Sequence, residues 1–485
     1  MSSQKKKDLV VLGAGVTGLS SAFFAKQNNL DCLVVEKDKY AGGLAKTIRY
    51  KDFKFDLGGH RFVTHHSNLY RFITRLLKDD YVTVKRSSKI YLNKRYINYP
   101  LEPINAFFHT GIKNTVHIIS DYLKQKVLNI KQSTNPKSLE DWIVSHYGRR
   151  LYHLFFKSYS EKVWGIDCSK IDKEWIIQRI QGLSLGQAIK RAVFQSKGNR
   201  FKTLADEFLY PSNGIGDIID GLCDGIDKNS MSLNSEIISI NHDSNKIESI
   251  DIVHAGKQIN VPAKQLINTI PITRFARLLN PEPPAEIKHA IDKLRSRDLV
   301  VVTLFINKPQ VTKDNWIYFP DKSVPFGRIH EPPNWSAAMS PSGKTSIVAE
   351  FFCFHGDPVW QSSEEDIVSK TVAALQDMQL ITQDEVIDSK VIRIRHAYPL
   401  FELDFSTHCE IVCQYLDGFE NLNLAGRSGM FRYYNLDQAM LSGIDAISSL
   451  LPNNDSSVDS LLTEYLTSER GRNNEVRTDN TSMAT

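Results

Sequence analysis

The stretch Asp8–Glu36, DLVVLGAGVTGLSSAFFAKQNNLDCLVVE, decides the fold of this chain. A short apolar run is followed at once by Gly13, Gly15 and Gly18, then by a helical pattern and a second apolar run that ends in Glu36. This order predicts a strand, a helix and a second, parallel strand, with a Gly-x-Gly-x-x-Gly fingerprint at the first turn. The fingerprint in this context indicates a βαβ unit that binds a dinucleotide.

Each glycine of the fingerprint has a physical task. Gly13 allows the tight turn, Gly15 lets backbone N–H groups approach a pyrophosphate, and Gly18 lets helix and strand pack closely. The pyrophosphate would lie at the helix N-terminus, where N–H groups and the macrodipole favour an anion, and Glu36 would accept hydrogen bonds from the adenosine ribose. The cofactor-binding residues predicted from this stretch are Gly13, Ala14, Gly15, Thr17, Gly18, Glu36 and Lys37.

The residues that follow distinguish FAD from a nicotinamide cofactor. They contain a second glycine loop at Gly42 and Gly43 and then FDLGGH, which ends in Gly59 and His60. A nicotinamide dehydrogenase would normally continue with another strand and helix, whereas further glycine turns suit an extended cofactor that the backbone touches along its length. We therefore expect FAD, with Gly43, Leu44, Gly59 and His60 also in its binding site.

Composition limits the class of protein. A chain of 485 residues with 41% hydrophobic residues should form two or three domains. The 60 basic and 55 acidic residues are interspersed, so we expect no nucleic-acid partner. The six cysteines form no CxxC pair, which favours reduced thiols and no metal site. Because no signal peptide and no apolar run of about 20 residues are present, we expect a cytoplasmic protein without a membrane span.

In the rest of the chain, the spacing of the hydrophobic residues changes several times between strand-like and helix-like patterns. Residues 89–99 alternate and predict a hairpin with its turn near Asn93 and Lys94, and Ser138-x-x-Asp141 resembles a helix-capping box within a helical region. Short strands resume after residue 201, among them 258–261 and 265–269. We predict an α/β fold, in which a Rossmann-like FAD-binding domain of the glutathione reductase type carries a helical insert and an antiparallel β-sheet domain. The expected bounds are 1–64, 202–275 and 390–450 for the discontinuous FAD-binding domain, 100–200 for the helical domain, 65–99 and 276–389 for the sheet domain that binds substrate, and 470–485 for a disordered tail.

The closing motif NLNLAGRSGMFRYYNLDQAMLSGIDA, residues 421–446, predicts a strand, a glycine turn and a helix. A helix N-terminus directed at the flavin would stabilise negative charge on the reduced ring. This motif adds Gly426, Arg427, Asp437 and Gln438 to the predicted cofactor-binding residues.

Several motifs together resemble known flavoproteins. GAGVTGL, GGLAKT and FDLGGH in the amino-terminal half resemble the amine oxidase and protoporphyrinogen oxidase group. Later segments resemble UDP-galactopyranose mutase in the same order along the chain: SYSEKVWG (158–165), YPSNGIG (210–216), NWIYFP (315–320), PFGR (325–328), HAYP (396–399) and LAGRSGMFRYYNLDQ (424–438). The resemblance covers most of residues 8–450 and implies the same three-domain organisation.

The mutase resemblance implies a definite chemistry. Reduced FAD would attack the anomeric carbon of a nucleotide sugar, the nucleoside diphosphate would leave, and the sugar would reclose in the other ring size without net redox change, for surface polysaccharide biosynthesis. Arg328 and Arg427 fall on the two arginines that hold the diphosphate, where guanidinium forks bind phosphate oxygens bidentately. His60 matches a histidine close to the flavin, and the resemblance thus implies that Arg328, Arg427 and His60 are the catalytic residues. The residues that the resemblance places around the substrate are Tyr318, Tyr398, Tyr433, Trp164 and Arg179.

Two function classes stay open from the sequence, the nucleotide-sugar mutase and a flavin-dependent oxidoreductase. An oxidase or dehydrogenase of the protoporphyrinogen oxidase type would take a hydride from an apolar or amine substrate and would need an apolar tunnel rather than paired arginines. A non-catalytic flavoprotein would have no physical reason to keep so polar a pocket. The segment GRIHEPPNW around Arg328 departs from the mutase pattern, so the sugar and the base are not predicted. NAD(P)H is a candidate reductant, and a homo-oligomer is a candidate assembly.

Overall fold

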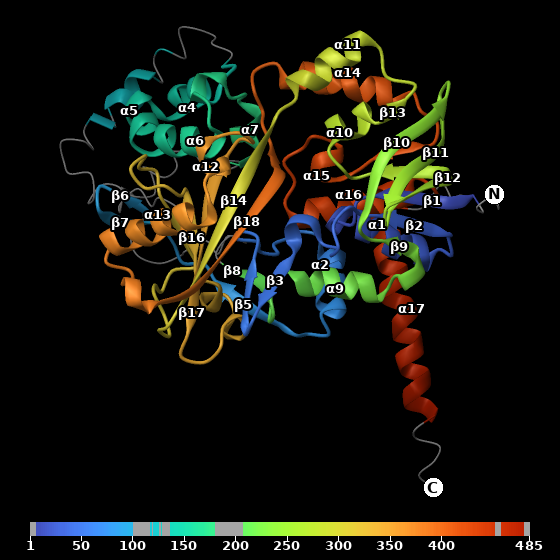
Figure 1. Ribbon diagram of the computed structural model, residues 1–485, viewed down its shortest axis with the longest axis horizontal. Helices are drawn as coiled ribbons and strands as arrows, with labels where there is room; N and C mark the ends of the chain where they lie inside the picture. The colour runs from blue at the N-terminus through green and yellow to red at the C-terminus, as the bar shows by residue number, and fades with distance from the viewer. Residues whose placement is uncertain are drawn as a thin grey trace.

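The computed structural model describes residues 6–99, 117–118, 120–125, 128, 136–179, 207–451 and 457–479 of the chain. Two large sheets stand beside each other, and a group of helices lies above the second sheet (Figure 1). The predicted α/β class is therefore confirmed.

The first sheet contains the predicted βαβ unit. Strands β1 (Lys7–Leu12) and β2 (Cys32–Val35) pair in parallel and are joined by helix α1 (Val16–Gln27). The parallel part continues on both sides, in the order β19-β12-β1-β2-β9. The other strands of this sheet are β9 (Met231–Ser232), β10 (Ser235–Asp243), β11 (Lys246–His254), β12 (Lys257–Asn268), β13 (Leu279–Asn280) and β19 (Leu422–Leu424).

Strand β12 belongs to both the antiparallel and the parallel part of this sheet. Its pairing with β11 is antiparallel and ends at Pro262, and its parallel pairing with β1 begins at Ala263. Sequence analysis expected two strands here, 258–261 and 265–269. A single strand forms instead because the chain exchanges one partner for the other without a turn.

Helices cover both faces of the first sheet. Alternate residues of β1 contribute to opposite cores, since Val11 packs on the side of Phe24 and Val10 on the side of Phe275. Strands buried on both faces are typical of parallel sheets. On the side of Phe24 lie α1, α2 (Ser67–Leu76), α9 (Gly216–Asp224), α16 (Leu436–Ser448) and α17 (Val458–Asp479). On the side of Phe275 lie α10 (Ile272–Arg277), α11 (Ala285–Lys293) and α14 (Phe405–Asp417).

The second sheet has the order β18-β14-β17-β16-β15-β6-β7. Its pairs are antiparallel except β15 with β6, which is parallel, so the predicted antiparallel sheet contains one parallel pair. The predicted hairpin turn is confirmed at Asn93 and Lys94, whose φ angles are 51° and 60°. The strands are β6 (Ser88–Leu92), β7 (Arg95–Tyr99), β14 (Ser296–Ile306), β15 (Trp316–Tyr318), β16 (Arg328–His330), β17 (Thr345–Cys353) and β18 (Val386–Pro399). Helices α12 (Pro358–Gln361) and α13 (Glu364–Asp377) follow β17.

The helical insert begins with the predicted capping box. Ser138 Oγ accepts from the Asp141 N–H at 3.1 Å, and the Asp141 carboxylate accepts from the Ser138 N–H at 3.2 Å. The described helices are α4 (Leu139–Tyr147), α5 (Arg149–Leu151), a π-helical turn (Tyr152–Phe156), α6 (Lys157–Trp164) and α7 (Glu174–Arg179). Much of the predicted helical domain 100–200, with the side chain of Arg179, lies outside the described residues.

Smaller elements connect these layers. They are the strand pairs β3 (Thr47–Tyr50) with β4 (Phe53–Asp56) and β5 (Tyr81–Lys85) with β8 (Glu207–Pro211), the short helix α15 (Gly426–Gly429), and the 3-10 turns Gly43–Ala45, Cys168–Lys170, Lys228–Ser230, Pro332–Asn334, Ala337–Met339 and Gln383–Glu385.

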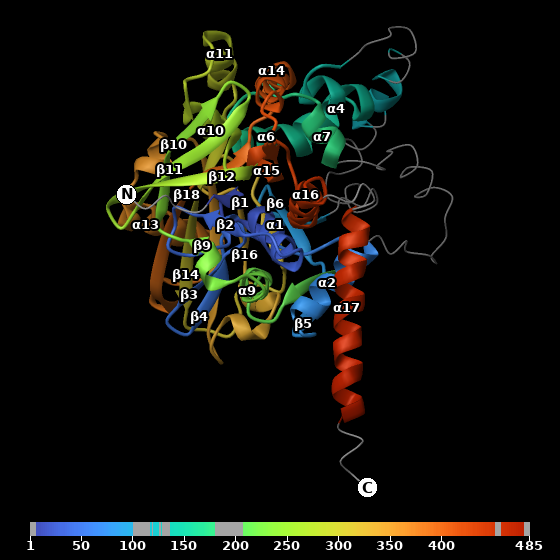
Figure 2. The same ribbon diagram turned by 90° about the vertical axis from the view of Figure 1, so that its right-hand side faces the viewer.

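Several of the expected domain bounds differ from the grouping of helices and strands that the packing shows. Helix α2 packs through Phe72 against Phe24, and α11 packs through Ile291 against Phe275, so both helices belong with the first sheet rather than the second. Residues 390–399 belong to β18 of the second sheet. Helix α17 projects from the body in both views and continues into the segment expected as a tail, of which 480–485 lies outside the described residues (Figures 1 and 2).

Candidate active site

The fingerprint glycines differ in what surrounds them. A Cβ on Gly18 would lie 2.0 Å from the Gly13 carbonyl oxygen, and one on Gly13, whose φ is +99°, would lie 2.8 Å from Thr269 Oγ1. At Gly15 a Cβ would meet nothing within 4 Å. The protein's own packing therefore requires two of the glycines, and the space at Gly15 is left for a ligand.

The N-terminus of α1 is suited to an anion. No side chain caps its first N–H groups, and its first turn carries no acidic residue. Glu36, at the end of β2, accepts from the Ala14 N–H at 2.8 Å and keeps acceptor capacity for a ribose. The second glycine loop closes on the same place, because the Gly42 N–H donates to the Ala14 carbonyl at 2.7 Å. These residues fit the adenosine diphosphate half of FAD, while Lys37 is exposed.

The closing motif meets the fingerprint directly. Gly426 has a φ of +78°, and a Cβ there would lie 2.5 Å from Thr17 Oγ1. Helix α16 then packs on α1, where Ser21 Oγ donates to the Gly443 carbonyl at 2.9 Å. Gln438, predicted to bind the cofactor, closes a capping box by accepting from the Asn435 N–H at 3.0 Å. This bond engages the Oε1 atom of the Gln438 side chain.

Arg328 is held by a buried carboxylate. Its Nε and Nη2 donate to Glu350 at 2.6 and 2.5 Å, and Nη2 also donates to the Tyr398 hydroxyl at 2.9 Å. Glu350 is fully buried, and only 16% of the Arg328 side chain is exposed. Burial opposes the charge of Arg328, but Glu350 and the neighbouring phenols raise its pKa above the ordinary value. The bidentate edge of this guanidinium is thus used inside the protein.

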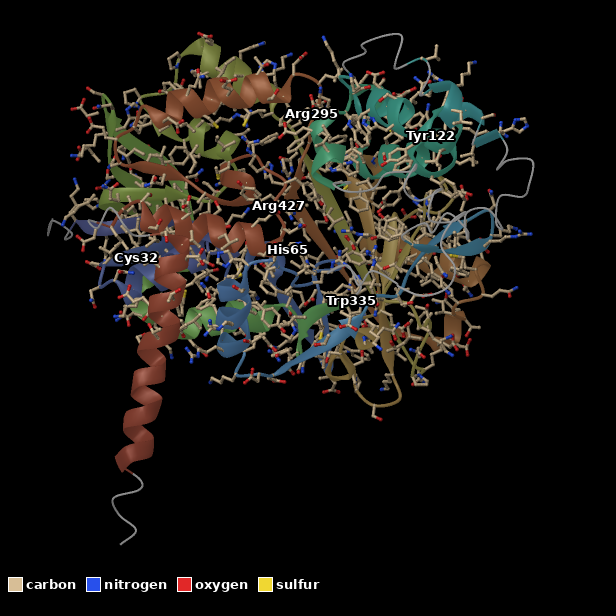
Figure 3. The ribbon with its side chains drawn as sticks, turned by 180° about the vertical axis from the view of Figure 1, so that it is seen from behind. Cys32, His65, Tyr122, Arg295, Trp335 and Arg427 are labelled. Atoms are coloured by element: carbon tan, nitrogen blue, oxygen red, sulfur yellow. The ribbon has the colours of Figure 1, made fainter. Side chains whose placement is uncertain are left out.

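Arg427 is anchored by carbonyl oxygens. Its Nε donates to Tyr434 O at 2.8 Å, its Nη2 donates to the same atom, and its Nη1 lies 3.4 Å from Ala397 O. Among the described residues, no carboxylate lies within 4.0 Å of Arg427, so its positive charge is not balanced by an ion pair. Figure 3 shows Arg427 near the middle of the molecule.

Aromatic side chains line the space beside the two arginines. Tyr398 and Tyr433 are stacked with ring centroids 6.0 Å apart and planes at 9°, and Arg427 Cζ lies 5.5 and 5.0 Å from these two centroids. Trp164 presents an edge to both rings at 6.4 and 6.3 Å. Tyr318 lies 5.9 Å from Trp316, with the two planes at 12°. The predicted substrate residues with described side chains therefore gather around the arginines.

His60 connects the cofactor region to the second sheet. Burial, Arg427 and Arg328 lower the pKa of His60 to about 3, so its imidazole is neutral, and its buried Nδ1 has no hydrogen-bond partner among the described residues. The preceding residue, Gly59, donates its N–H to Glu350 at 3.3 Å. A Cβ on Gly59 would lie 2.5 Å from Trp316. The glycine turn thus approaches the second sheet as closely as a side-chain-free residue allows.

Sequence analysis missed three residues at this site. Tyr159 of α6 meets Tyr318 edge to face at 5.5 Å, and burial raises its pKa well above the ordinary value. Glu350 and Trp316 are the other two. A single acid within the apolar run TSIVAEFFCF was a usable signal, because a buried carboxylate needs a partner. Tyr159 and Trp316 stood in motifs already quoted, but nothing local distinguished them from packing residues.

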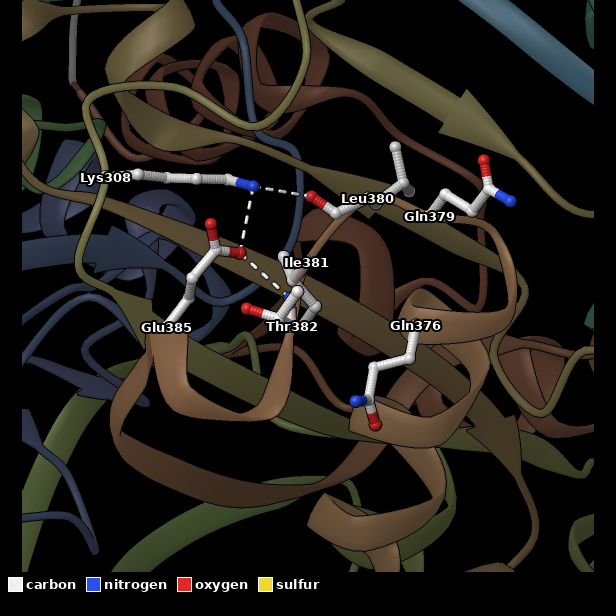
Figure 4. A pocket seen from close by; sticks show the side chains of 7 residues that line it. All are labelled: Lys308, Gln376, Gln379, Leu380, Ile381, Thr382 and Glu385. Atoms are coloured by element: carbon white, nitrogen blue, oxygen red, sulfur yellow. Dashed lines mark hydrogen bonds and ion pairs between the residues drawn. The ribbon is translucent and has the colours of Figure 1, made fainter.

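A separate pocket, of about 310 Å³, lies beside the end of β14 (Figure 4). Its cation, Lys308, donates to the Leu380 carbonyl at 2.7 Å and to Glu385 at 3.0 Å. Since none of its lining residues belongs to the aromatic and arginine site, it does not extend that site.

The family model for flavin-containing amine oxidoreductases matches residues 16–446. The chain belongs to this family. It is therefore a flavoprotein, and the expected cofactor class agrees with the geometry at the two glycine loops. No described helix has the length and hydropathy needed to cross a membrane.

Known relatives include both oxidases and mutases. Over 265 residues the chain is 21% identical to protoporphyrinogen oxidase 2 of Arabidopsis thaliana, covering 49% of this chain and 51% of the relative. Over 171 residues it is 24% identical to dTDP-fucopyranose mutase of Escherichia coli, covering 34% and 43%. The chain thus spans about half or less of the length of these relatives. A crystal structure of reduced UDP-galactopyranose mutase has a TM-score of 0.80 at 19% identity, covering 94% of this chain and 96% of that one, which shows the fold.

Proposed function

We propose that this flavoenzyme is a nucleotide-sugar mutase that interconverts pyranose and furanose rings, in surface polysaccharide biosynthesis. The observation that carries the proposal is the position of two arginines at one tyrosine. Arg328 donates to the Tyr398 hydroxyl, and Arg427 Cζ lies 5.5 Å from the centroid of the same ring. Two guanidinium groups at one buried aromatic wall suit an anionic ligand that accepts several hydrogen bonds, such as a nucleoside diphosphate.

The two arginines have different parts in this proposal. Arg427, anchored by carbonyls, supplies a charge that a diphosphate would balance. Arg328 already shares its charge with Glu350, so it serves mainly as a donor from the nitrogen that Glu350 does not engage. Burial raises the pKa of Tyr318 and of Tyr398, so both phenols stay protonated and can donate to phosphate or sugar oxygens.

The flavin and the residues around it would provide the nucleophile and a water-poor environment for the reaction. FAD in its reduced form would supply a nucleophile at N5 for the anomeric carbon, with no net transfer of electrons. Trp164 and the stacked pair Tyr398 and Tyr433 exclude water from the diphosphate side, and electrostatic attraction is stronger in such a site. His60, kept neutral by burial and the two arginines, adds no further positive charge.

A flavin-dependent oxidoreductase is the second candidate. The family assignment and the similarity to a protoporphyrinogen oxidase favour it. Such an enzyme would pass electrons to an acceptor in proportion to product. The paired arginines favour an anionic substrate, and the similarity to dTDP-fucopyranose mutase adds to the case for the mutase.

The experiment is a substrate panel with the flavin in a defined redox state. Dithionite-reduced protein is incubated with UDP-, GDP- and dTDP-linked hexopyranoses, and ring-size isomers are separated by chromatography. We expect one nucleotide sugar to yield its furanose isomer with reduced protein and none with oxidised protein. NADH and NADPH then replace dithionite, to test either as the reductant. Oxidation of a substrate that depends on an acceptor, with no ring isomer, would replace the proposal by the oxidoreductase.

A further inference from the structure

Lys162 of α6 makes three hydrogen bonds to one loop. Its Nζ donates to the carbonyl oxygens of Phe319 at 2.9 Å, Asp321 at 2.8 Å and Val324 at 2.8 Å. An ammonium group has three N–H donors, so every donor of Lys162 is used on backbone. Burial lowers the pKa of Lys162 to about 7, and the nearby charge of Asp321 opposes this shift.

The bonded loop carries a site residue at each end. Strand β15 ends at Tyr318, strand β16 begins at Arg328, and these two residues are partners in the ladder. The Phe319 N–H donates to the Gly327 carbonyl at 2.9 Å, which closes the loop directly behind the pair. A shift of the loop would therefore move the Tyr318 phenol and the Arg328 guanidinium together.

Helix α6 carries the facing part of the same site. Tyr159, one turn before Lys162, meets Tyr318 at 5.5 Å. Trp164, at the end of the helix, meets Tyr398 and Tyr433. Lys162 thus stands between two groups of site residues that belong to different regions of the fold, and its bonds run from one region to the other.

We propose that Lys162 is a positioning residue: its three bonds to the loop 319–327 hold Tyr318 and Arg328 in register with Tyr159 and Trp164, so that one pocket forms from the helical insert and the second sheet. The consequence for catalysis rests on the proposed function. The lysine itself does not contact the substrate, because its donors are all directed at the loop. A small ammonium on a long stem can reach three carbonyls from one point, whereas a planar guanidinium cannot match that arrangement.

The test compares Lys162→Met with Lys322→Met. Both remove one positive charge, but Lys322 lies on the loop itself with 72% of its side chain exposed and only a surface ion pair to Glu161 at 3.3 Å. Hydrogen exchange of the amides in 319–327 is measured first, since it needs no ligand. Binding of UDP, dTDP and GDP is then followed by tryptophan fluorescence, and KM and kcat are measured for the active nucleotide sugar.

We expect faster exchange in the loop for Lys162→Met and unchanged exchange for Lys322→Met. The Kd of the bound diphosphate and the KM should rise roughly tenfold in Lys162→Met, with a smaller fall in kcat, because misplaced binding groups act first on affinity. Lys162→Arg, which keeps the charge, should recover part of the affinity.

Two results would overturn the inference. Unchanged exchange in Lys162→Met would mean that the lysine does not hold the loop. Faster exchange with unaltered Kd and KM would mean that the loop's order does not matter to the pocket. If the wild-type protein binds none of the three diphosphates, the proposed function fails and the positioning of a diphosphate pocket fails with it, while the exchange result still decides whether Lys162 holds the loop.

Discussion

Glu350 and Arg328 are partners across the β16–β17 ladder, and the buried carboxylate accepts from both Nε and Nη2 of the arginine, at 2.6 and 2.5 Å. The mutase resemblance implied that the Arg328 guanidinium binds the diphosphate through its fork. In the structure, Glu350 accepts both hydrogen bonds of that fork. A diphosphate could therefore accept a hydrogen bond only from Nη1, and it would otherwise be attracted by the positive charge. The position of Arg328 therefore depends on an acid from the neighbouring strand.

Replacing Arg328 by Lys should lower kcat/KM. Lysine keeps the charge but cannot make the paired bonds to Glu350, so the cation loses its fixed position. A loss of about 1.5 to 3 kcal/mol in transition-state stabilisation, or roughly ten- to a hundredfold in rate, is expected. Steady-state kinetics with the reduced enzyme, together with the flavin absorption spectrum to show that cofactor remains bound, checks this.

A paired variant separates stability from function at the same place. Arg328→Ala alone leaves the Glu350 carboxylate buried without its cationic partner, which should cost about 3 to 5 kcal/mol of stability. Arg328→Met combined with Glu350→Gln removes both charges and should recover most of the thermal midpoint without recovering turnover. Wild-type turnover in the double variant would show that neither charge is needed by the reaction.

Asp56 should make stability depend on pH. Burial raises its pKa to about 7 from 3.8, although Thr47 and Tyr210 donate to the carboxyl at 2.6 Å each. Between these values the folded state binds more protons than the unfolded state, so stability should fall as the pH rises from about 4 to about 7.

The comparison for Asp56 is the uncharged variant Asp56→Asn. The thermal midpoint of the wild type should drop more between pH 5 and pH 7.5 than that of the variant. A wild-type midpoint that rises relative to the variant over this interval would mean that the donors hold the carboxyl ionised, and that the assigned direction of the pKa shift is wrong.

The parts of the site that could be predicted are those set by local sequence. The fingerprint could be recognised from Gly13, Gly15 and Gly18 because each glycine acts within one turn. The Ser138–Asp141 capping box could be recognised because it spans only four consecutive positions. Arg427 could be placed in the site because its motif is contiguous. The anchoring of Arg427 by the Tyr434 carbonyl could not be predicted, since backbone acceptors have no sequence pattern.

The parts that were missed depend on strand register and on packing between regions. Glu350 meets Arg328 only because β16 and β17 align at that pair, and a shift of one residue would direct the carboxylate to the other face of the sheet. Helix α2 was assigned to the second sheet, but Phe72 packs against Phe24 of α1. Neither contact leaves a periodic signal in a single sequence.

Turnover should require reduced flavin but consume no reductant in proportion to product. This follows from the proposed ring interconversion, in which the sugar is neither oxidised nor reduced. The measurement counts product formed per equivalent of dithionite under anaerobic conditions, and many turnovers per equivalent are expected. One equivalent of oxygen or acceptor consumed for each product would instead identify an oxidoreductase.

Gly15→Val should abolish FAD binding while the protein still folds. The φ and ψ of Gly15, −73° and 175°, are accessible to valine, and a Cβ there meets no protein atom within 4 Å. The side chain would occupy only the space where a pyrophosphate approaches the helix. The purified variant should be colourless, with the circular dichroism and thermal midpoint of wild-type apoprotein. Gly18→Val provides the contrast, because its Cβ would lie 2.0 Å from the Gly13 carbonyl, so folding itself should fail. A yellow Gly15→Val protein with one FAD per chain would show that the pyrophosphate does not lie at this turn.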